Sequence, residues 1–385
     1  MELQVFTDLD TFLAHQRAWD DLWERSGVVL PTARAELVAH WVRHFAQGGD
    51  FRCLAVADHN RLVAGLPLVQ RWIKGLVPAG DLPANPWAVH GELLLDASAD
   101  LPKALQCLCQ GIHQTPWQML WIDLALVQSL WWQELMAQAQ KVGMSGLVHL
   151  RYPVGLVYLD ENFSTYWASR SSNLHRKVRK CCQRLEEAGP VQLRVIQQAS
   201  AEQWEEELDT AWRIEDASWK GTAGSSVLRT SGMREFYFNQ AQILAQWGYA
   251  QLVFLQVATR PIAFAFGWES KGVVQVCKIG YDPDFSGCSP GHLLWWLWFQ
   301  RLAETRKTVL VDFSGPLTDA TRLWANGSYP VGRVVLSPHW FGKWMIAGYQ
   351  AYRTCRGRQN PPDWLEACTA PGPIPKIPEF ESAPV

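Results

Sequence analysis

The amino-acid sequence predicts an α/β (α+β) fold in which mixed sheets are flanked by helices, built from two similar halves. Stripes of apolar residues at helical spacing alternate along the chain with short β-rich runs, an alternation typical of layered α/β folds. The order of these elements repeats after about 190 to 200 residues, as expected of a duplicated unit. We therefore expect two tandem domains of the same kind.

Apolar stripes place the helices. Between Leu101 and Ile112, apolar residues recur at i, i+3, i+4, i+7, i+8 and i+11, which is one face of a helix. Shorter stripes lie at 37–45, 130–136 and 204–212. The β-rich runs that predict strands lie at 51–57, 62–69, 119–124, 147–159, 191–196, 251–257, 262–268, 273–279 and 308–313.

Two pairs of segments show the repeat. FRCLAVADHNRLVAGLPLV, from Phe51, and AQLVFLQVATRPIAFAFGW, from Ala250, both read as strand, short turn and strand. Strands near 120–124 and 310–313 each follow a predicted helix. We expect a degenerate N-terminal domain at 1–150, a linking strand and helix start at 151–180, and the second domain at 181–345. A helical segment at 346–368 and a Pro-rich disordered tail at 369–385 are expected to follow.

Composition excludes several classes of protein. With 48% hydrophobic residues, the chain of 385 residues can bury a core. The 35 basic and 37 acidic residues give a net charge of −2, so no overall attraction to nucleic acid or anionic membranes is expected. The N-terminus lacks a secretory pattern, and the apolar run at 293–299 is too short to span a membrane. The nine cysteines form no CxxC pair, so we expect reduced thiols, no metal site and a cytoplasmic protein.

The segment from Lys278 to Glu304 carries the most chemical information. It runs from a strand, through a loop of small residues, into a helix with Ser289 as a fitting N-cap and Pro290 as its first residue. Such a helix start presents unpaired N–H groups to an anion, and Gly287 and Gly291 would let a phosphate approach the backbone. An ordinary capped helix after a strand would show the same residues.

Four segments resemble a known family: AWRIEDASWKG from Ala211, GYDPDFSGCSPG from Gly280, VDFSG from Val311, and SSNLHRKVRKCCQRLEEAG from Ser171. The first three, in this order, resemble GNAT-superfamily acetyltransferases of the CelD/BcsL (cellulose-biosynthesis) type, and the segment from Ser171 resembles the helix that usually opens that family's domain. The tandem arrangement resembles the Fem-type aminoacyl transferases. The likeness covers about residues 165 to 340.

The resemblance implies two tandem GNAT-like domains whose central strands are partly splayed, so that the arm of acyl-CoA enters between two strands. The donor diphosphate would rest on Gly287, Cys288, Ser289, Pro290 and Gly291. This loop has only Gly287 where the commonest superfamily loop has two closely spaced glycines. The corresponding loop of the first half, DASAD from Asp96, has no glycine, so one donor site is expected, in the second half.

Acyl transfer to an amine needs a base, a group that polarises the thioester carbonyl and a proton for the leaving thiolate. Lys278 could stabilise the oxyanion, and Glu215 or Asp216 could act as the base; all three could equally be surface groups. Asp282 and Asp312 follow strands, where α/β folds gather ligand groups, although Asp282 could be a turn former. Cys288 could also donate a proton or be a buried thiol.

Substrate contacts are expected from Trp219 and Lys220, beside these acids, and from Arg176 and Lys180. The last two lie in the basic segment 171–184, which has no acidic residue and could capture a phosphorylated donor, a carrier or tRNA. A solvated helix face is the plain alternative.

The resemblance and these residues together imply an N-acyltransferase that moves an acyl group from acyl-CoA, or an acyl carrier protein, to an amine by direct attack in a ternary complex. The acceptor would be an amino sugar, an amino acid or a peptide. One alternative is a Fem-like transferase that uses aminoacyl-tRNA, the only role in which nucleic acid is expected. The other is a non-catalytic GNAT-fold binding or assembly module.

Overall fold

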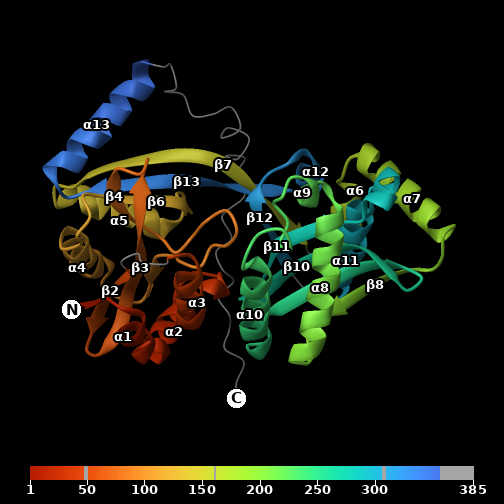
Figure 1. The fold of residues 1–385 in the computed structure, drawn as a ribbon. Coiled ribbons are helices and arrows are strands. Elements are labelled where there is room, and N and C mark those ends of the chain that lie inside the picture. The colour runs from red at the N-terminus through yellow and green to blue at the C-terminus, as the bar shows by residue number, and fades with distance from the viewer. Residues whose placement is uncertain (47–50, 160–161, 306–308, 356–385) are drawn as a thin grey trace. The chain divides into compact units, whose positions relative to one another are not determined.

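The computed structural model describes residues 1–46, 51–159, 162–305 and 309–355 (Figure 1). The chain divides into two compact units. Unit 1 holds Met1–Pro153 and the segment from Tyr329 onward, and unit 2 holds Val154–Ser328. The expected tail at 369–385, and most of the helical segment expected at 346–368, lie outside the described residues.

Unit 1 is a mixed sheet with helices on both faces. Its strand order is β1-β2-β3-β4-β6-β13-β7, and β5 pairs with β3. The elements are β1 (Glu2–Phe6), α1 (Leu9–Ala14), α2 (Gln16–Arg25), η1 (Pro31–Ala33), α3 (Ala35–Phe45), β2 (Phe51–Asp58), β3 (Arg61–Ile73), β4 (Val77–Asp81), β5 (Leu94–Leu95), α4 (Leu101–His113), β6 (Leu120–Ala125), α5 (Leu130–Lys141), β7 (Ser145–Leu159), β13 (Gly327–Ser337) and α13 (Trp340–Cys355). The strands β7 and β13 run across the boundary between the units in the chain.

Unit 2 repeats this plan. Its strand order is β7-β12-β11-β10-β9-β8. Its other elements are α6 (Phe163–Ala168), α7 (Ser172–Glu186), β8 (Val191–Ile196), α8 (Ala201–Ala217), α9 (Trp219–Thr222), α10 (Met233–Gln246), β9 (Ala250–Val257), β10 (Arg260–Ser270), β11 (Val273–Tyr281), η2 (Pro283–Cys288), α11 (Pro290–Thr305), β12 (Val309–Pro316) and α12 (Asp319–Arg322).

The sequence patterns placed the elements well. Every β-rich run named above falls on a strand, and the stripe from Leu101 falls on α4. The repeated hairpins are the antiparallel pairs β2–β3 and β9–β10, each followed by a parallel pair, β4–β6 or β11–β12. The expected fold class, a mixed α/β fold with sheets flanked by helices, is therefore confirmed.

The division of the chain differs from the expected one at its C-terminal side. We expected residues up to 345 to belong to the second domain. Instead the chain returns to unit 1 at Tyr329, because β13 pairs with β6, with Leu336 opposite Leu120. A periodicity marks a strand but not its partner, so the sequence did not reveal this exchange.

The two faces of the unit 2 sheet are packed differently. On one face, α7 and α11 bury Ala263, Ala265 and neighbouring residues in an apolar core. On the other, Trp212 of α8 contacts the edges of Phe264 and Phe266. Figure 1 shows α8 and α10 in front of these strands. The tryptophans of α11 serve mainly as core, since Trp295 and Trp298 are buried and stack on each other.

The parallel strands β11 and β12 part after three residue pairs. They pair from Val273 opposite Leu310 to Gln275 opposite Asp312, and no further. Beyond this point β11 continues along β10 to Tyr281, while β12 continues along β7 to Pro316. The splayed central strands expected from the resemblance are therefore present in unit 2.

A β-bulge marks the point of divergence. Lys278 lies opposite Phe266 and Val276 lies opposite Gly267, so Cys277 is one extra residue on β11. A bulge bends its strand and increases its twist. Gly267 permits this approach: a Cβ there would lie 1.9 Å from the carbonyl oxygen of Gln275. The bulge thus turns β11 away from β12.

The equivalent opening in unit 1 is closed by a side chain. The parallel strands β4 and β6 share only the pair Gly80 and Leu120. Immediately beyond it, the Asp81 carboxylate accepts a hydrogen bond from the backbone N–H of Asp123, at 2.9 Å. The carboxylate thereby connects the two strands where β11 and β12 are left apart.

Among the described residues, no helix has both the length and the apolar composition needed to cross a membrane.

Replacing Gly267 tests the bulge. Gly267→Ala should lower the free energy of unfolding by about 1–3 kcal/mol, because the new Cβ must displace the backbone of Gln275. The measurement is urea denaturation followed by tryptophan fluorescence. The matched control is Gly315→Ala in the same unit, whose Cβ would have its nearest neighbour at 3.7 Å. Equal stability of the two variants would contradict the assigned role of Gly267.

Candidate functional site

Three charged side chains meet beside the bulge of β11, and we call them the lysine–glutamate cluster: Glu215, Lys220 and Lys278. Glu215, at the end of α8, is fully buried. Its Oε1 accepts a hydrogen bond from Lys220 Nζ at 2.8 Å and lies 4.0 Å from Lys278 Nζ. Its Oε2 accepts from the backbone N–H of Val227 at 2.9 Å. The sequence candidates Glu215, Lys220 and Lys278 are therefore brought together.

Lys278 is largely buried. Its side chain is 13% exposed, and its ammonium lies 5.0 Å from the ring centre of Tyr237. Burial lowers the pKa of Lys278, and the nearby Glu215 carboxylate opposes that effect. A lysine in this state can give up its proton more readily than one in water.

Tyr237 and Cys277 complete the surroundings of Lys278. Burial raises the pKa of Tyr237 well above its ordinary value and raises the pKa of Cys277 to about 11. Both groups are therefore neutral near pH 7. They are uncharged neighbours of the Lys278 ammonium.

The motif from Glu215 to Gly221 has a compact local structure. Ser218 caps α9, and a Cβ at Gly221 would lie 1.8 Å from the carbonyl oxygen of Asp216, so this turn requires glycine. The Asp216 side chain accepts hydrogen bonds from Ser226 and Arg229, and the bond from Arg229 holds its pKa below the usual value. The Trp219 side chain is 70% exposed, next to the cluster in the chain.

The loop from Asp282 to Gly291 precedes α11. Asp282 accepts a hydrogen bond from the backbone N–H of Asp284 and pairs with Arg260, as a turn former does. Ser289 adopts a left-handed conformation, with φ of 56°, and Pro290 begins the helix. Within the described chain the N–H of Gly291 has no acceptor, and a Cβ at Gly291 would meet nothing within 4 Å. The helix start is therefore open, with a free amide.

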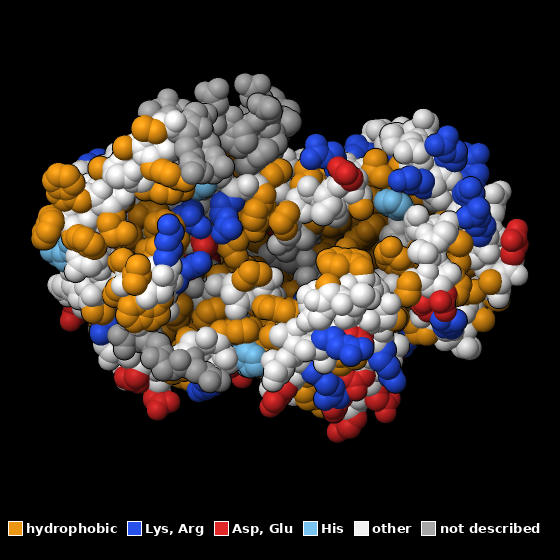
Figure 2. Space-filling view, turned by 45° about the horizontal axis from the view of Figure 1, so that its top comes forward, with side chains coloured by type: hydrophobic (Ala, Val, Ile, Leu, Met, Phe, Trp, Pro, Cys, Tyr) orange, Lys and Arg blue, Asp and Glu red, His pale blue; other side chains and the backbone are white. Residues whose placement is uncertain are grey.

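Arg184 connects this loop to α7. Its Nη1 donates a hydrogen bond to the carbonyl oxygen of Gly287 at 2.7 Å. The other basic residues of α7, including Arg176 and Lys180, are exposed, while Leu174, Val178, Cys181 and Leu185 face the core. Figure 2 shows the resulting strip of Lys and Arg side chains where Figure 1 places α7. Arg176 bonds only to Asn173 within its own helix among the described contacts.

Asp312 lies where β12 leaves β11. It is buried, and its carboxylate accepts a hydrogen bond from the backbone N–H of Ser314 at 2.6 Å. Ser314 has a φ of 53°, a left-handed conformation at the place where the register between β12 and β7 shifts. Asp312 therefore shapes the bend of β12, as the bulge at Cys277 shapes that of β11.

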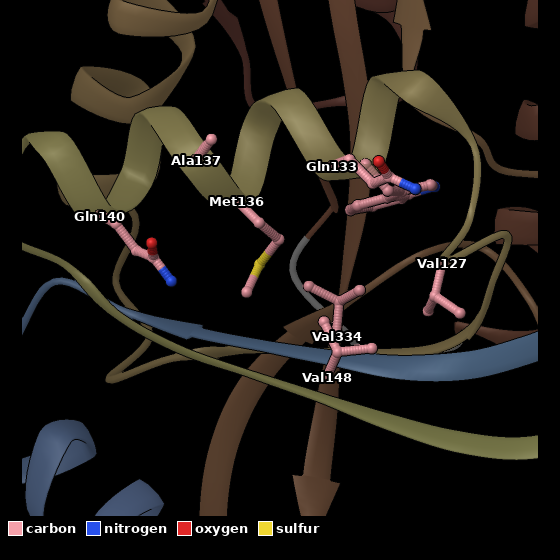
Figure 3. Close-up of a pocket in the computed structure, with 8 residues that line it drawn as sticks. Val127, Gln133, Met136, Ala137, Gln140, Val148 and Val334 are labelled. Atoms are coloured by element: carbon pink, nitrogen blue, oxygen red, sulfur yellow. The ribbon is translucent and has the colours of Figure 1, made fainter. Parts of the chain in front are cut away.

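A separate apolar cavity of about 270 Å³ lies in unit 1. Figure 3 shows side chains of α5 above it and Val148 and Val334 of β7 and β13 below. Its lining residues are Val127, Trp132, Gln133, Met136, Ala137, Gln140, Val148 and Val334. None of the candidate site residues from the sequence lines this cavity.

Sequence reasoning did not assign roles to Tyr237, Cys277 or Arg184. Tyr237 lies on α10, and no motif links it to Lys278. Cys277 precedes Lys278, but a bulge leaves no mark in strand periodicity. Arg184 belongs to the basic segment, yet only the structure separates it from its neighbours, because it alone among the described contacts of that segment reaches Gly287.

Comparisons with known proteins agree with this geometry. Residues 172–320 match the model of the acetyltransferase (GNAT) domain family. Over these residues the chain is similar to GNAT acetyltransferases. The match contains the lysine–glutamate cluster, the bulge of β11 and the loop before α11. The narrower CelD/BcsL type remains a prediction.

Solved structures show the same fold over most of the chain. FemX has a TM-score of 0.55 and 11% identity, with 87% of this chain and 97% of that chain covered. The C-terminal domain of a putative lysylphosphatidylglycerol synthetase from Agrobacterium fabrum has a TM-score of 0.52 and 10% identity, covering 87% and 95%. A conserved protein of unknown function from Bacteroides thetaiotaomicron scores 0.53, with 14% identity, covering 84% and 97%. No curated protein sequence matches the chain.

The electrostatics of the lysine–glutamate cluster can be tested at Lys278. Glu215→Gln should lower the pKa of Lys278 further, because it removes the negative charge that favours the ammonium form. The pKa is read from the pH dependence of the Cε chemical shift in protein with ¹³C-labelled lysine, assigned with Lys278→Met. Glu206→Gln, an exposed position on the same helix, is the control and should leave the pKa unchanged. An unchanged or higher pKa in Glu215→Gln would refute the coupling.

Proposed function

We propose that the protein is an N-acyltransferase that moves an acyl group from acyl-CoA, or from an acyl carrier protein, to an amine. The acceptor class is an amino sugar, an amino acid or a peptide. The parting of β11 and β12 and the open helix start carry this proposal, because they offer a strand edge for a thioester arm and an amide site for a diphosphate.

The donor is proposed to bind along β11. Past Gln275, β11 pairs with β10 alone among the strands that the structure describes, so an extended amide-containing arm can bond to its other edge as an added strand would. The diphosphate then meets the loop from Gly287 to Gly291, including the free N–H of Gly291. Arg184, fixed to Gly287, adds positive charge at the same place.

The amine can attack the thioester directly, and the reaction needs no covalent intermediate between the acyl group and the enzyme. The amine nitrogen attacks the thioester carbonyl carbon, the C–N bond forms, and the C–S bond breaks. Lys278 stabilises the developing oxyanion by its charge and passes a proton to the leaving thiolate. It regains a proton from the newly acylated nitrogen, for which its lowered pKa is suited.

Glu215 is proposed as a positioning residue, since both of its oxygens already accept hydrogen bonds within the protein. It holds Lys220 and Lys278 beside β11. Asp216 is likewise engaged by Arg229 and Ser226, and Asp282 caps η2. Trp219, exposed next to Lys220, is proposed to contact the acceptor. A cytoplasmic location, where acyl-CoA is available, is part of this proposal.

One observation favours a second donor. The exposed face of α7 carries Arg176, Lys177, Arg179, Lys180 and Arg184 without an acidic neighbour in the first turn. Such a strip suits a polyanion, so aminoacyl-tRNA is the alternative donor for the same centre.

Binding of CoA tests the proposal. At free CoA of about 100 times its Kd, the protein should gain about 2.7 kcal/mol of stability, measured as a thermal shift. Gly291→Trp should abolish the gain, because its side chain fills the open space beside the free amide. The control is Gly348→Trp, also at a position with nothing within 4 Å of its Cβ, which should keep the gain.

The outcome separates the three functions. The tRNA donor would be selected if aminoacyl-tRNA raises the melting temperature and CoA does not. That thermal shift should fall steeply with salt and disappear after ribonuclease treatment. A shift with neither CoA, acylated carrier protein nor aminoacyl-tRNA would leave a binding or assembly module and overturn the transferase proposal.

A further inference from the structure

Five neighbouring strands of unit 1 each place one charged residue in a row across the sheet. In the order β3-β4-β6-β13-β7, these residues are Arg71, Asp81, Asp123, Arg333 and Arg151. Arg71 Nη1 lies 2.7 Å from Asp81 and 2.8 Å from Asp123. Arg333 Nε and Arg151 Nη1 lie 2.7 and 3.0 Å from the other oxygen of Asp123. We call the three guanidinium groups the arginine row.

Helices cover the same face of the sheet on both sides of the row. Ile73 and Val335, two residues beyond Arg71 and Arg333 on their strands, pack under Ile346 of α13. In the other direction along β3, a Cβ at Gly65 would point into Trp19 of α2. Because side chains alternate along a strand, all of these positions share the face of the row. The arginine row therefore lies on the part of this sheet face between the areas that α2 and α13 cover.

The arginines form the outer layer of the cluster and the aspartates the inner one. The side chains of Arg71 and Arg151 are 41% and 37% exposed, whereas Asp81 and Asp123 are buried. Figure 2 shows basic side chains gathered around a small acidic spot within a largely hydrophobic surface. A ligand would therefore meet guanidinium groups first.

The cluster has an excess of positive charge. Three guanidinium groups face two carboxylates. Burial raises the pKa of Asp81 to about 7, against the effect of Arg71. Against its own burial, Arg333 and the other arginines hold the pKa of Asp123 below the usual value. At least one positive charge is left uncompensated.

The arginines also retain hydrogen-bond donors. Each guanidinium has five N–H groups. Within the part of the chain that the structure describes, Nε and Nη2 of both Arg71 and Arg151 have no acceptor. Asp123 fixes all three guanidinium groups, and Arg333 lies 4.4 Å from the ring centre of Trp121. These donors are therefore held in place before any ligand arrives.

We propose that the arginine row is a binding site for an oxyanion, a phosphate or a carboxylate, carried by a ligand of unit 1. Planar guanidinium groups bind either oxyanion through paired hydrogen bonds. Asp123 acts as a positioning residue. This site is separate from the lysine–glutamate cluster and does not depend on acyl transfer.

The test is isothermal titration of the full chain with pyrophosphate, inorganic phosphate and succinate at constant ionic strength. The titrations use the Gly291→Trp background, because the loop before α11 is itself proposed to take a diphosphate. Saturable binding of at least one probe is expected. Tighter binding of the phosphates identifies a phosphorylated ligand, and tighter binding of succinate identifies a carboxylate.

Substitutions locate the site. Arg151→Gln should weaken binding of the probe about 10-fold or more. Arg151→Lys keeps the charge but loses the planar guanidinium, so its affinity should lie between those of Arg151→Gln and the parent protein. Arg17→Gln, an exposed arginine on α2, is the control and should bind like the parent. Melting curves verify folding. Absence of saturable binding for all three probes, or equal binding by Arg151→Gln and Arg17→Gln, would overturn the proposal.

Discussion

The bulge at Cys277 is the constraint on which the arrangement of unit 2 depends. A parallel pair such as β11 and β12 would ordinarily bury its edge amides in a continuous ladder. One extra residue, accommodated because Gly267 has no side chain, turns β11 away after Gln275. The same turn places Cys277 and Lys278 beside Tyr237 and Glu215. A single irregularity therefore produces both an open strand edge and a buried ammonium.

The two units differ at the place where the pairing of their two parallel strands ends. Both contain an antiparallel hairpin followed by a parallel pair with a helical crossover. In unit 2 the parallel strands separate after Gln275 and Asp312. In unit 1 the Asp81 side chain joins β4 to the amide of Asp123, and arginines surround both aspartates. The same arrangement of strands therefore carries a cluster of charged side chains in unit 1 and a pair of separated strands in unit 2.

The features that the sequence could predict are those that depend on residues close together in the chain. Stripes such as Leu101 to Ile112 and runs such as 251–257 depend on neighbours a few residues apart, so the sequence predicted those elements and the repeat. Lys278 and Glu215 were candidates because they sit in recognisable segments. Tyr237, Arg184 and the arginine row could not be found in this way, because their partners lie on other strands and helices. The return of β13 to unit 1 was missed for the same reason.

Hydrogen–deuterium exchange with and without CoA tests the opening most directly. If the thioester arm lies along the unpaired edge of β11 and the diphosphate rests before α11, CoA should slow amide exchange within residues 276–291. Peptides from β9, whose amides are already paired with β8 and β10, should be unchanged. CoA binding that leaves exchange in 276–291 unaltered, or that protects β4 and β6 of unit 1 instead, would contradict the account.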